Sequence, residues 1–142
     1  MDKKKDFASK LRSSGLRPTK QRLKLAELLF NREKTFHFNV ENIDKAINKK
    51  NSEEKIALAT IYNTIHAFKK AGHLKEILLK EGKNYFDTNT SSHHHFYDEI
   101  NNELFDIDNN KIELKKFPTP PKGKFIKNIN VIISIDNDNQ NH

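Results

Sequence analysis

The chain lacks cysteine altogether, and it lacks any long hydrophobic run. The absence of cysteine excludes disulfide bonds, iron–sulfur clusters, thiolate zinc sites and a cysteine nucleophile. No apolar segment approaches the roughly 18–20 residues that span a bilayer, and no apolar stretch follows the charged start at residues 1–5. We therefore expect a soluble, cytoplasmic protein without a membrane partner.

Charge is distributed unevenly along the 142 residues, which are enough for one ordinary domain or two small ones. Residues 1–86 contain 20 Lys and Arg against 10 Asp and Glu, whereas residues 87–142 contain 6 against 9. A basic first half suits a polyanion, most often nucleic acid. A lysine-rich solvated surface would give the same composition, so charge alone leaves both readings open.

Hydrophobic periodicity predicts four helices in the first half, at residues 7–11, 18–30, 40–47 and 58–70. Gly15 and Gly72 are placed as helix stops, and Asn39 as an N-cap. Residues 74–80 and 84–88 then read as a hairpin around residues 81–83. Helices that end in such a hairpin make a winged helix-turn-helix domain.

The second half reads as strands at residues 93–99, 103–108 and 129–135, with a proline-containing loop before the last. The last strand is apolar and β-branched, which suits a buried sheet. We therefore predict an α+β protein with a winged-helix domain at residues 1–86 and a second domain at residues 87–142.

The helix at residues 58–70 has the two faces that a DNA-reading helix needs. Ile61, Ile65 and Phe68 recur at i, i+4 and i+7 and form the packing face. A mixed polar face is also what any surface helix shows. If the helix does read DNA, its base- and phosphate-contacting residues are Thr60, Tyr62, Asn63, His66 and Lys69, with Arg17, Lys20 and Arg22 as backbone clamps.

Three consecutive histidines, His93–His95, are the strongest chemical signal in the chain. Neutral imidazole is a common protein ligand for iron, zinc and related metals, and adjacent imidazoles gain nothing for packing. In a strand, His93 and His95 point to one face and His94 to the other. The ligand candidates around this run are His37, Asp87, His93, His94, His95, Asp98, Glu99, Asp106 and Glu113. Taken singly, His37 reads as a surface histidine and Asp106 as an exposed strand residue.

Several motifs together resemble the ferric uptake regulator superfamily: GLRPTKQR at residues 15–22, LATIYNTI at 58–65, KAG at 70–72 and the histidine run. The detail at residues 62–64, 85–89 and 93–97 looks most like its iron response regulator branch. The likeness keeps the same order over about residues 11–135. It implies an N-terminal winged-helix domain, a small C-terminal α/β dimerisation domain and a homodimer that binds double-stranded operator DNA.

The resemblance also implies roles for particular residues. It assigns a regulatory metal site to His37, Asp87, His93, His95 and Asp106, and it implies that Tyr62 reads the operator. Asn63 stands where other members carry Arg, so we expect a different operator sequence. Ala57 stands where many members place a Ser cap, which predicts a weaker helix start. The paired Cys-x-x-Cys sites of many members are absent, so there is no structural zinc held by four cysteines.

A second site would use His94 and Glu113, but a histidine that members place near the last strand is replaced by an apolar residue around Ile129. His94 could instead serve haem, which is associated with the iron response branch. Haem and a divalent metal therefore both stay open at this position.

The function we expect is a dimeric transcription regulator that responds to iron status, through haem or a divalent metal (Fe²⁺, Mn²⁺ or Zn²⁺), at operators of iron and haem genes. It is not expected to be an enzyme. One alternative is a peroxide- or manganese-sensing regulator of the same superfamily. Others are a metal-independent DNA-binding module and a small non-haem metalloenzyme, because two histidines and a carboxylate can support such chemistry. The rich ligand set argues against the enzyme, since it would close the site.

Overall fold

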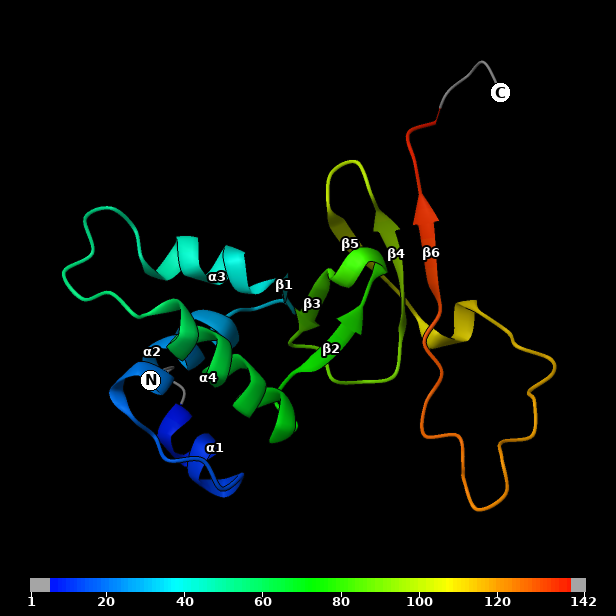
Figure 1. Ribbon diagram of the computed structural model, residues 1–142, viewed down its shortest axis with the longest axis horizontal. Coiled ribbons are helices and arrows are strands. Elements are labelled where there is room, and N and C mark those ends of the chain that lie inside the picture. Colours follow the sequence, from blue (N-terminus) through cyan, green and yellow to red (C-terminus); the bar gives the residue numbers. More distant parts are fainter. Residues whose placement is uncertain (1–5, 139–142) are drawn as a thin grey trace. The chain divides into compact units, whose positions relative to one another are not determined.

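The computed structural model describes residues 6–138, and the chain divides into two compact units, Met1–Thr90 and Ser91–His142 (Figure 1). We call these unit 1 and unit 2. The division comes four residues after the predicted one at 86/87, because Asp87 completes a strand of unit 1. Among the described residues, no helix is long and apolar enough to cross a membrane.

The described part of unit 1 consists of four α-helices and a small sheet (Figure 1). The helices predicted at residues 40–47 and 58–70 have those bounds in the structure, and the other two differ at their ends by a few residues. The elements of unit 1 are α1 (Phe7–Ser13), α2 (Lys20–Phe30), β1 (His37–Phe38), α3 (Val40–Ile47), α4 (Leu58–Lys70), β2 (Lys75–Leu78), the short 3₁₀ helix η1 (Lys80–Gly82) and β3 (Asn84–Asp87).

The helix ends follow from local side-chain chemistry. Asn39 and Asn42 form a reciprocal capping box, in which each side-chain oxygen accepts from the other's backbone N–H. Ala57, by contrast, gives α4 no side-chain cap, so the cap is missing where the sequence predicted a weaker start. Gly72 ends α4 at φ 88°, a conformation that glycine adopts without strain, and the His73 N–H then closes on the Phe68 carbonyl at 2.9 Å.

The sheet of unit 1 has the order β1-β3-β2, and both pairings are antiparallel. The hairpin of β2 and β3 is the predicted wing. The two-residue strand β1 was not predicted, and it pairs His37 with Asp87 and Phe38 with Phe86. This extra strand therefore brings a residue from before α3 onto the end of the wing.

One hydrophobic core joins the helices of unit 1 to its sheet. Ile61, Ile65 and Phe68 are fully buried, so the packing face predicted for α4 is confirmed. The core cluster consists of Leu11, Leu25, Ala26, Leu29, Phe38, Ile43, Ile47, Ile56, Ile61, Ile65, Phe68, Leu74 and Phe86. Because this core binds the packing face of α4, the other face of the helix points away from the core.

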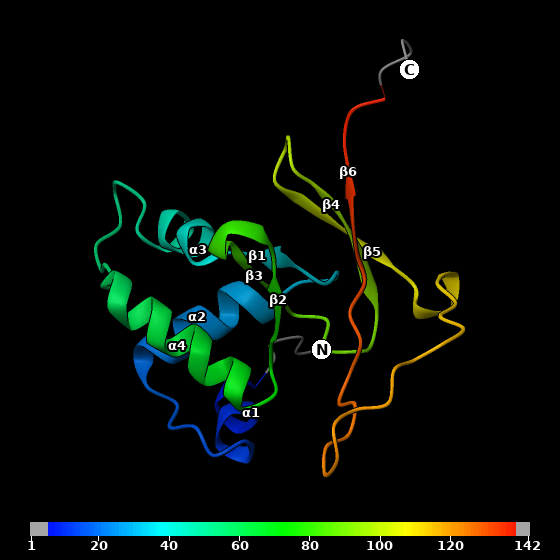
Figure 2. The same ribbon diagram turned by 45° about the vertical axis from the view of Figure 1, so that its right-hand side comes forward.

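Unit 2 is a three-stranded sheet of order β5-β4-β6, built along the chain from β4 (His94–Asp98), β5 (Glu103–Ile107), the 3₁₀ turn η2 (Asn109–Lys111) and β6 (Ile132–Ile135). β5 runs antiparallel to β4 and β6 runs parallel to it. Between η2 and β6 the chain makes a long excursion without regular structure (Figure 2). Within the described part of unit 2, helix is limited to η2, whereas an α/β domain was implied. Pro118, Pro120 and Pro121 disfavour a helix interior where they lie, because each lacks the N–H that a helix needs.

The last strand is less buried than its apolar sequence predicted. Ile133 is 40% exposed and Ser134 is also exposed. Ile133 pairs with Phe96 of β4, which in turn pairs with Phe105 of β5. These three exposed side chains form a row across one face of the sheet, which we call the apolar row.

Candidate metal centre and nucleic-acid interface

The outward face of α4 carries most of the predicted DNA-contacting side chains. Tyr62 is 52% exposed, Asn63 and Lys69 are exposed, and Thr60 and His66 are half-buried. The opposite face is fixed in the core, so the helix cannot rotate these groups inward. The arrangement suits insertion of α4 into a major groove.

A surface pocket of about 310 Å³ joins the start of α2 to the first half of α4. Arg22 spans its α2 side, because its Nη1 donates to the Arg17 carbonyl at 3.0 Å and its backbone N–H donates to the Thr19 hydroxyl. The pocket is lined by Arg17, Thr19, Gln21, Arg22, Thr60, Asn63 and Thr64. Four of the eight predicted DNA contacts, Arg17, Arg22, Thr60 and Asn63, therefore meet at one place.

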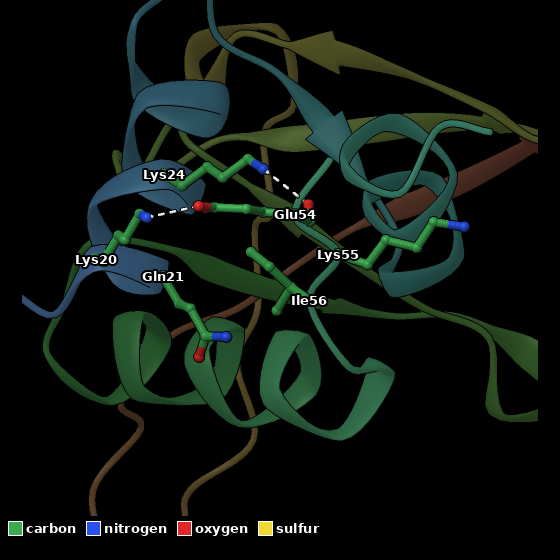
Figure 3. Close-up of a pocket in the computed structure, with 6 residues that line it drawn as sticks. All are labelled: Lys20, Gln21, Lys24, Glu54, Lys55 and Ile56. Carbon is green, nitrogen blue, oxygen red and sulfur yellow. Dashed lines mark hydrogen bonds and ion pairs between the residues drawn. The ribbon is translucent and has the colours of Figure 1, made fainter. Parts of the chain in front are cut away.

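Two of the predicted contacts are instead engaged in ion pairs. The Lys20 ammonium donates to Glu54 at 2.7 Å, in a neighbouring pocket where Lys24 also donates to the Glu54 carbonyl (Figure 3). Lys69 pairs with Glu76 of β2, which also accepts from Asn84. Exposed ion pairs such as Lys20–Glu54 are weak in water, so a phosphate can replace the carboxylate.

The first set of candidate metal ligands lies at the end of the sheet in unit 1. His37 of β1 faces Asp87 of β3, with 3.1 Å between His37 Nε2 and Asp87 Oδ2. The Asp87 carboxylate is fully buried, and its other oxygen accepts from the Asn89 N–H at 2.8 Å. A buried carboxylate is costly unless a cation or donors face it, so this position favours positive charge.

The second set lies in unit 2, where β4 and β5 pair His95 with Asp106. His93 Nε2 and His95 Nε2 lie 3.2 and 3.3 Å from the same oxygen of Asp106. The Nδ1 of His93 lies 2.7 Å from the Ser91 carbonyl, which can only accept. That bond places the proton on Nδ1 and leaves the Nε2 lone pair for a metal, as second-shell carbonyls do for histidine ligands.

The separations within both sets match those between ligands of a bound ion. Bonds of about 2.0–2.2 Å at tetrahedral or octahedral angles place neighbouring ligand atoms about 2.8–3.6 Å apart. The 3.1–3.3 Å separations lie in that range. All five residues predicted as the regulatory site are candidate metal ligands in the structure. Each set alone is too small to complete a coordination sphere.

His94 and Glu113, the predicted second site, have other surroundings. His94 is buried on the opposite face of β4 from His93 and His95, and its Nδ1 accepts the Val131 N–H at 3.0 Å. Glu113 is exposed after η2. Neither belongs to a group of three or more candidate ligands among residues 6–138. The predicted second site is thus untested, and His94 has a structural partner.

Sequence reasoning did not anticipate two supporting groups of the candidate centre. The Thr88 hydroxyl accepts from the Phe36 N–H at 2.8 Å and fastens the chain just before His37 to the end of β3. The Ser91 carbonyl orients His93. The only sequence signal for these two groups is the cluster of Thr and Ser beside the histidine run. A sequence does not show which backbone carbonyl will accept a hydrogen bond.

Comparison with known proteins identifies the family of this chain. The sequence profile of the Ferric uptake regulator family matches residues 13–133, so the chain belongs to that family. It is 29% identical over 119 residues to the ferric uptake regulation protein of Bordetella parapertussis, covering 83% of this chain and 84% of that protein. It is 32% identical over 91 residues to the peroxide operon regulator of Bacillus subtilis, covering 64% of this chain and 60% of that one.

The fold agrees with the family. A solved structure of the ferric uptake regulator from Pseudomonas aeruginosa with manganese superposes with a TM-score of 0.67 at 23% identity, covering 92% of this chain and 97% of that one. The winged-helix and α+β predictions are therefore confirmed. Members of the family are transcription regulators, which excludes the metalloenzyme reading. The iron response branch stays a prediction.

Proposed function

We propose that this chain is a cytoplasmic, dimeric, iron-responsive transcription regulator, in which one divalent metal ion controls binding of double-stranded operator DNA. The observation that carries the proposal is the pair of incomplete ligand sets, one in each unit. Asp87 and His93 are six residues apart, so a fully extended chain separates them by at most about 20 Å. Both sets can therefore bind the same ion.

The chemistry of the candidate ligands limits which ions the site would bind. Three imidazoles and two carboxylates without thiolate suit Fe²⁺, Mn²⁺ or Zn²⁺. We propose Fe²⁺ as the physiological ion, because similar proteins are named ferric uptake regulators. His37 and Asp87 would hold it from unit 1, and His93, His95 and Asp106 from unit 2. The ion supplies positive charge that both carboxylates can share.

Metal binding of this kind favours one arrangement of the units over others. The free energy of the ion is most favourable where all five ligands reach it, so the ion shifts the population toward that arrangement. In a dimer, this arrangement also sets the separation of the two α4 helices, which must match the two half-sites of an operator.

A metal ion is better supported than haem as the ligand. His93, His94 and His95 are each at most 5% exposed. Their rings contact protein groups: His93 and His95 contact Asp106, and His94 contacts the Val131 N–H. Haem would have to displace Asp106 to reach the Nε2 of His93 or His95, whereas an ion fits between ligand atoms about 3 Å apart.

The apolar row of unit 2 supports the homodimer. Phe96, Phe105 and Ile133 are 38%, 45% and 40% exposed, and they adjoin one another across three strands. An exposed contiguous apolar patch on a small domain marks an interaction surface. We propose a second copy of this chain as its occupant. Light scattering should show a dimer that Phe96→Glu converts to monomers, and a dimeric variant would contradict this assignment.

The test of the function is operator binding by the purified protein. A duplex selected from a random pool with Mn²⁺-loaded protein is titrated with metal-free, Mn²⁺-loaded and haem-treated protein. We expect Mn²⁺ to change operator affinity at least tenfold and His93→Ala/His95→Ala to abolish that change while the apo variant keeps its fold. An equal response of wild type and double variant would overturn the proposal.

A response to peroxide is the second candidate, favoured by similarity to a peroxide operon regulator. Fe²⁺ reduces peroxide readily and Mn²⁺ does not. The same assay after peroxide therefore separates the two: operator binding lost only by the Fe²⁺-loaded protein indicates a peroxide sensor. Unchanged binding indicates a regulator of metal supply.

A further inference from the structure

An aromatic contact links the DNA-reading face of α4 to the sheet that carries the first ligand set. Tyr62 and His66 lie one helical turn apart, and their ring centroids are 4.3 Å apart. His66 also contacts Phe86 of β3 edge-to-face, at 5.6 Å and 89°. The imidazole of His66 thus lies between the exposed Tyr62 and the buried Phe86.

Phe86 in turn contacts a residue that lies next to the candidate metal ligands in the sheet. Phe86 stacks on Phe38 at 5.7 Å, and this pair occupies the register position beside His37 and Asp87 in the β1–β3 ladder. Successive residues of a strand point to opposite faces, so the ligands and the two phenyl rings project from opposite sides of the same ladder. Any shift of that two-residue ladder moves both sets of side chains together.

We propose that His66 is the positioning residue that carries the metal state of His37 and Asp87 to the operator-reading Tyr62. This inference rests on the proposed function. An ion between His37 and Asp87 fixes the β1–β3 ladder, the ladder fixes Phe86, and Phe86 holds His66 against the Tyr62 ring. Tyr62 then meets DNA in one rotamer, without the entropy loss of an exposed side chain that is ordered on binding.

An aromatic pair at i and i+4 is common on helices and stabilises them only slightly. The contact across elements from His66 to Phe86 distinguishes this pair. Unit 1 also offers a matched control in His73. It is another partly buried histidine in edge contact with two phenyl rings, Phe30 at 6.1 Å and Phe68 at 6.2 Å, but it contacts neither strand of the ladder in these ring pairs.

The experiment measures operator affinity with and without Mn²⁺ for wild type, His66→Gln, His66→Phe and the control His73→Gln. We expect His66→Gln to reduce the Mn²⁺-dependent gain in affinity by about threefold to tenfold. His66→Phe should keep most of the gain because it retains a ring between Tyr62 and Phe86, and His73→Gln should keep all of it. Mn²⁺ affinity without DNA should be unchanged in every variant.

A double-mutant cycle with Tyr62→Ala locates the effect. If His66 acts through Tyr62, adding His66→Gln to Tyr62→Ala causes no further loss. A full Mn²⁺ response in His66→Gln, or a loss in His66→Phe equal to that in His66→Gln, would overturn the inference while leaving the regulator intact. Absence of any Mn²⁺ response in the wild type would instead reject the proposed function, and this inference with it.

Discussion

The two units of the chain differ most in the types of residue that they bury. Among residues 6–138, unit 1 buries fifteen hydrophobic side chains, whereas unit 2 buries three, Tyr97, Leu104 and Ile107. Unit 2 buries as many histidines, and it leaves the apolar row exposed. Unit 1 is therefore stabilised by its own hydrocarbon core, whereas we expect unit 2 to gain stability from the proposed ion and the proposed second copy.

The largest expected effect tests the core of unit 1. Phe68 is fully buried against Phe30 and the rest of the core, so Phe68→Ala should destabilise unit 1 by about 3–5 kcal/mol. Phe105→Ala, at a side chain 45% exposed, should cost less than about 1 kcal/mol in the monomer. Urea unfolding of metal-free protein measures both, and equal losses would contradict the contrast between the units.

The next effect concerns the ion and unit 2. Mn²⁺ at about one hundred times its dissociation constant should stabilise the folded protein by about 2.7 kcal/mol. Hydrogen exchange should show the gain in β4 and β5 more than in α2, and His95→Ala should remove it. Equal protection of α2 and β4 by Mn²⁺ would show that unit 2 does not depend on the ion in particular.

Helix caps test unit 1 at a smaller scale. Asn39→Ala removes the reciprocal capping box of α3 and should cost about 1 kcal/mol. Ala57→Ser supplies the side-chain cap that α4 lacks and should add about 0.5–1 kcal/mol. Thermal unfolding should move in opposite directions for the two variants. A shift of the same sign would mean that tertiary packing, and not capping, fixes these helix starts.

The smallest expected effect is a pH dependence at His73. Burial, and then the charge of Lys10, lower the pKa of His73 below its usual value of 6.5, and its Nε2 lies 2.7 Å from the Ser14 hydroxyl. The unfolded chain therefore binds the proton more readily than the folded one, so stability falls as pH drops below about 6.5. In metal-free protein, His73→Gln should lose less stability than wild type between pH 7 and pH 5. Parallel curves would exclude this contribution.

Sequence reasoning was most accurate where the signal is local. The bounds of α3 and α4 follow from hydrophobic period, Asn39 and Gly72. The strand β1 was not predicted, because two residues are too few to show a hydrophobic period. Yet the pairing of β1 with β3 is what places His37 opposite Asp87. The exposure of Ile133 was also not predicted, since an apolar strand sequence does not show which of its side chains the fold covers.

The candidate ligands could be named from their residue types and from the resemblance, whereas their pairing in space could not. Nothing in the sequence shows that His93 and His95 share one carboxylate oxygen of Asp106, because that depends on the β4–β5 register. Likewise, the ion pairs of Lys20 and Lys69 depend on glutamates seven or more residues away, so a basic residue at a plausible position cannot be assigned to DNA from sequence alone.

The central claim is that ligands from both units bind one ion. Mn²⁺ titration followed by electron paramagnetic resonance tests it most directly, on wild type, His37→Ala and His93→Ala, with Glu99→Gln as a control at an exposed carboxylate outside the set. We predict one tightly bound Mn²⁺ per chain, which is lost in both histidine variants and retained in the control. A His37→Ala protein that binds Mn²⁺ as tightly as wild type would contradict it.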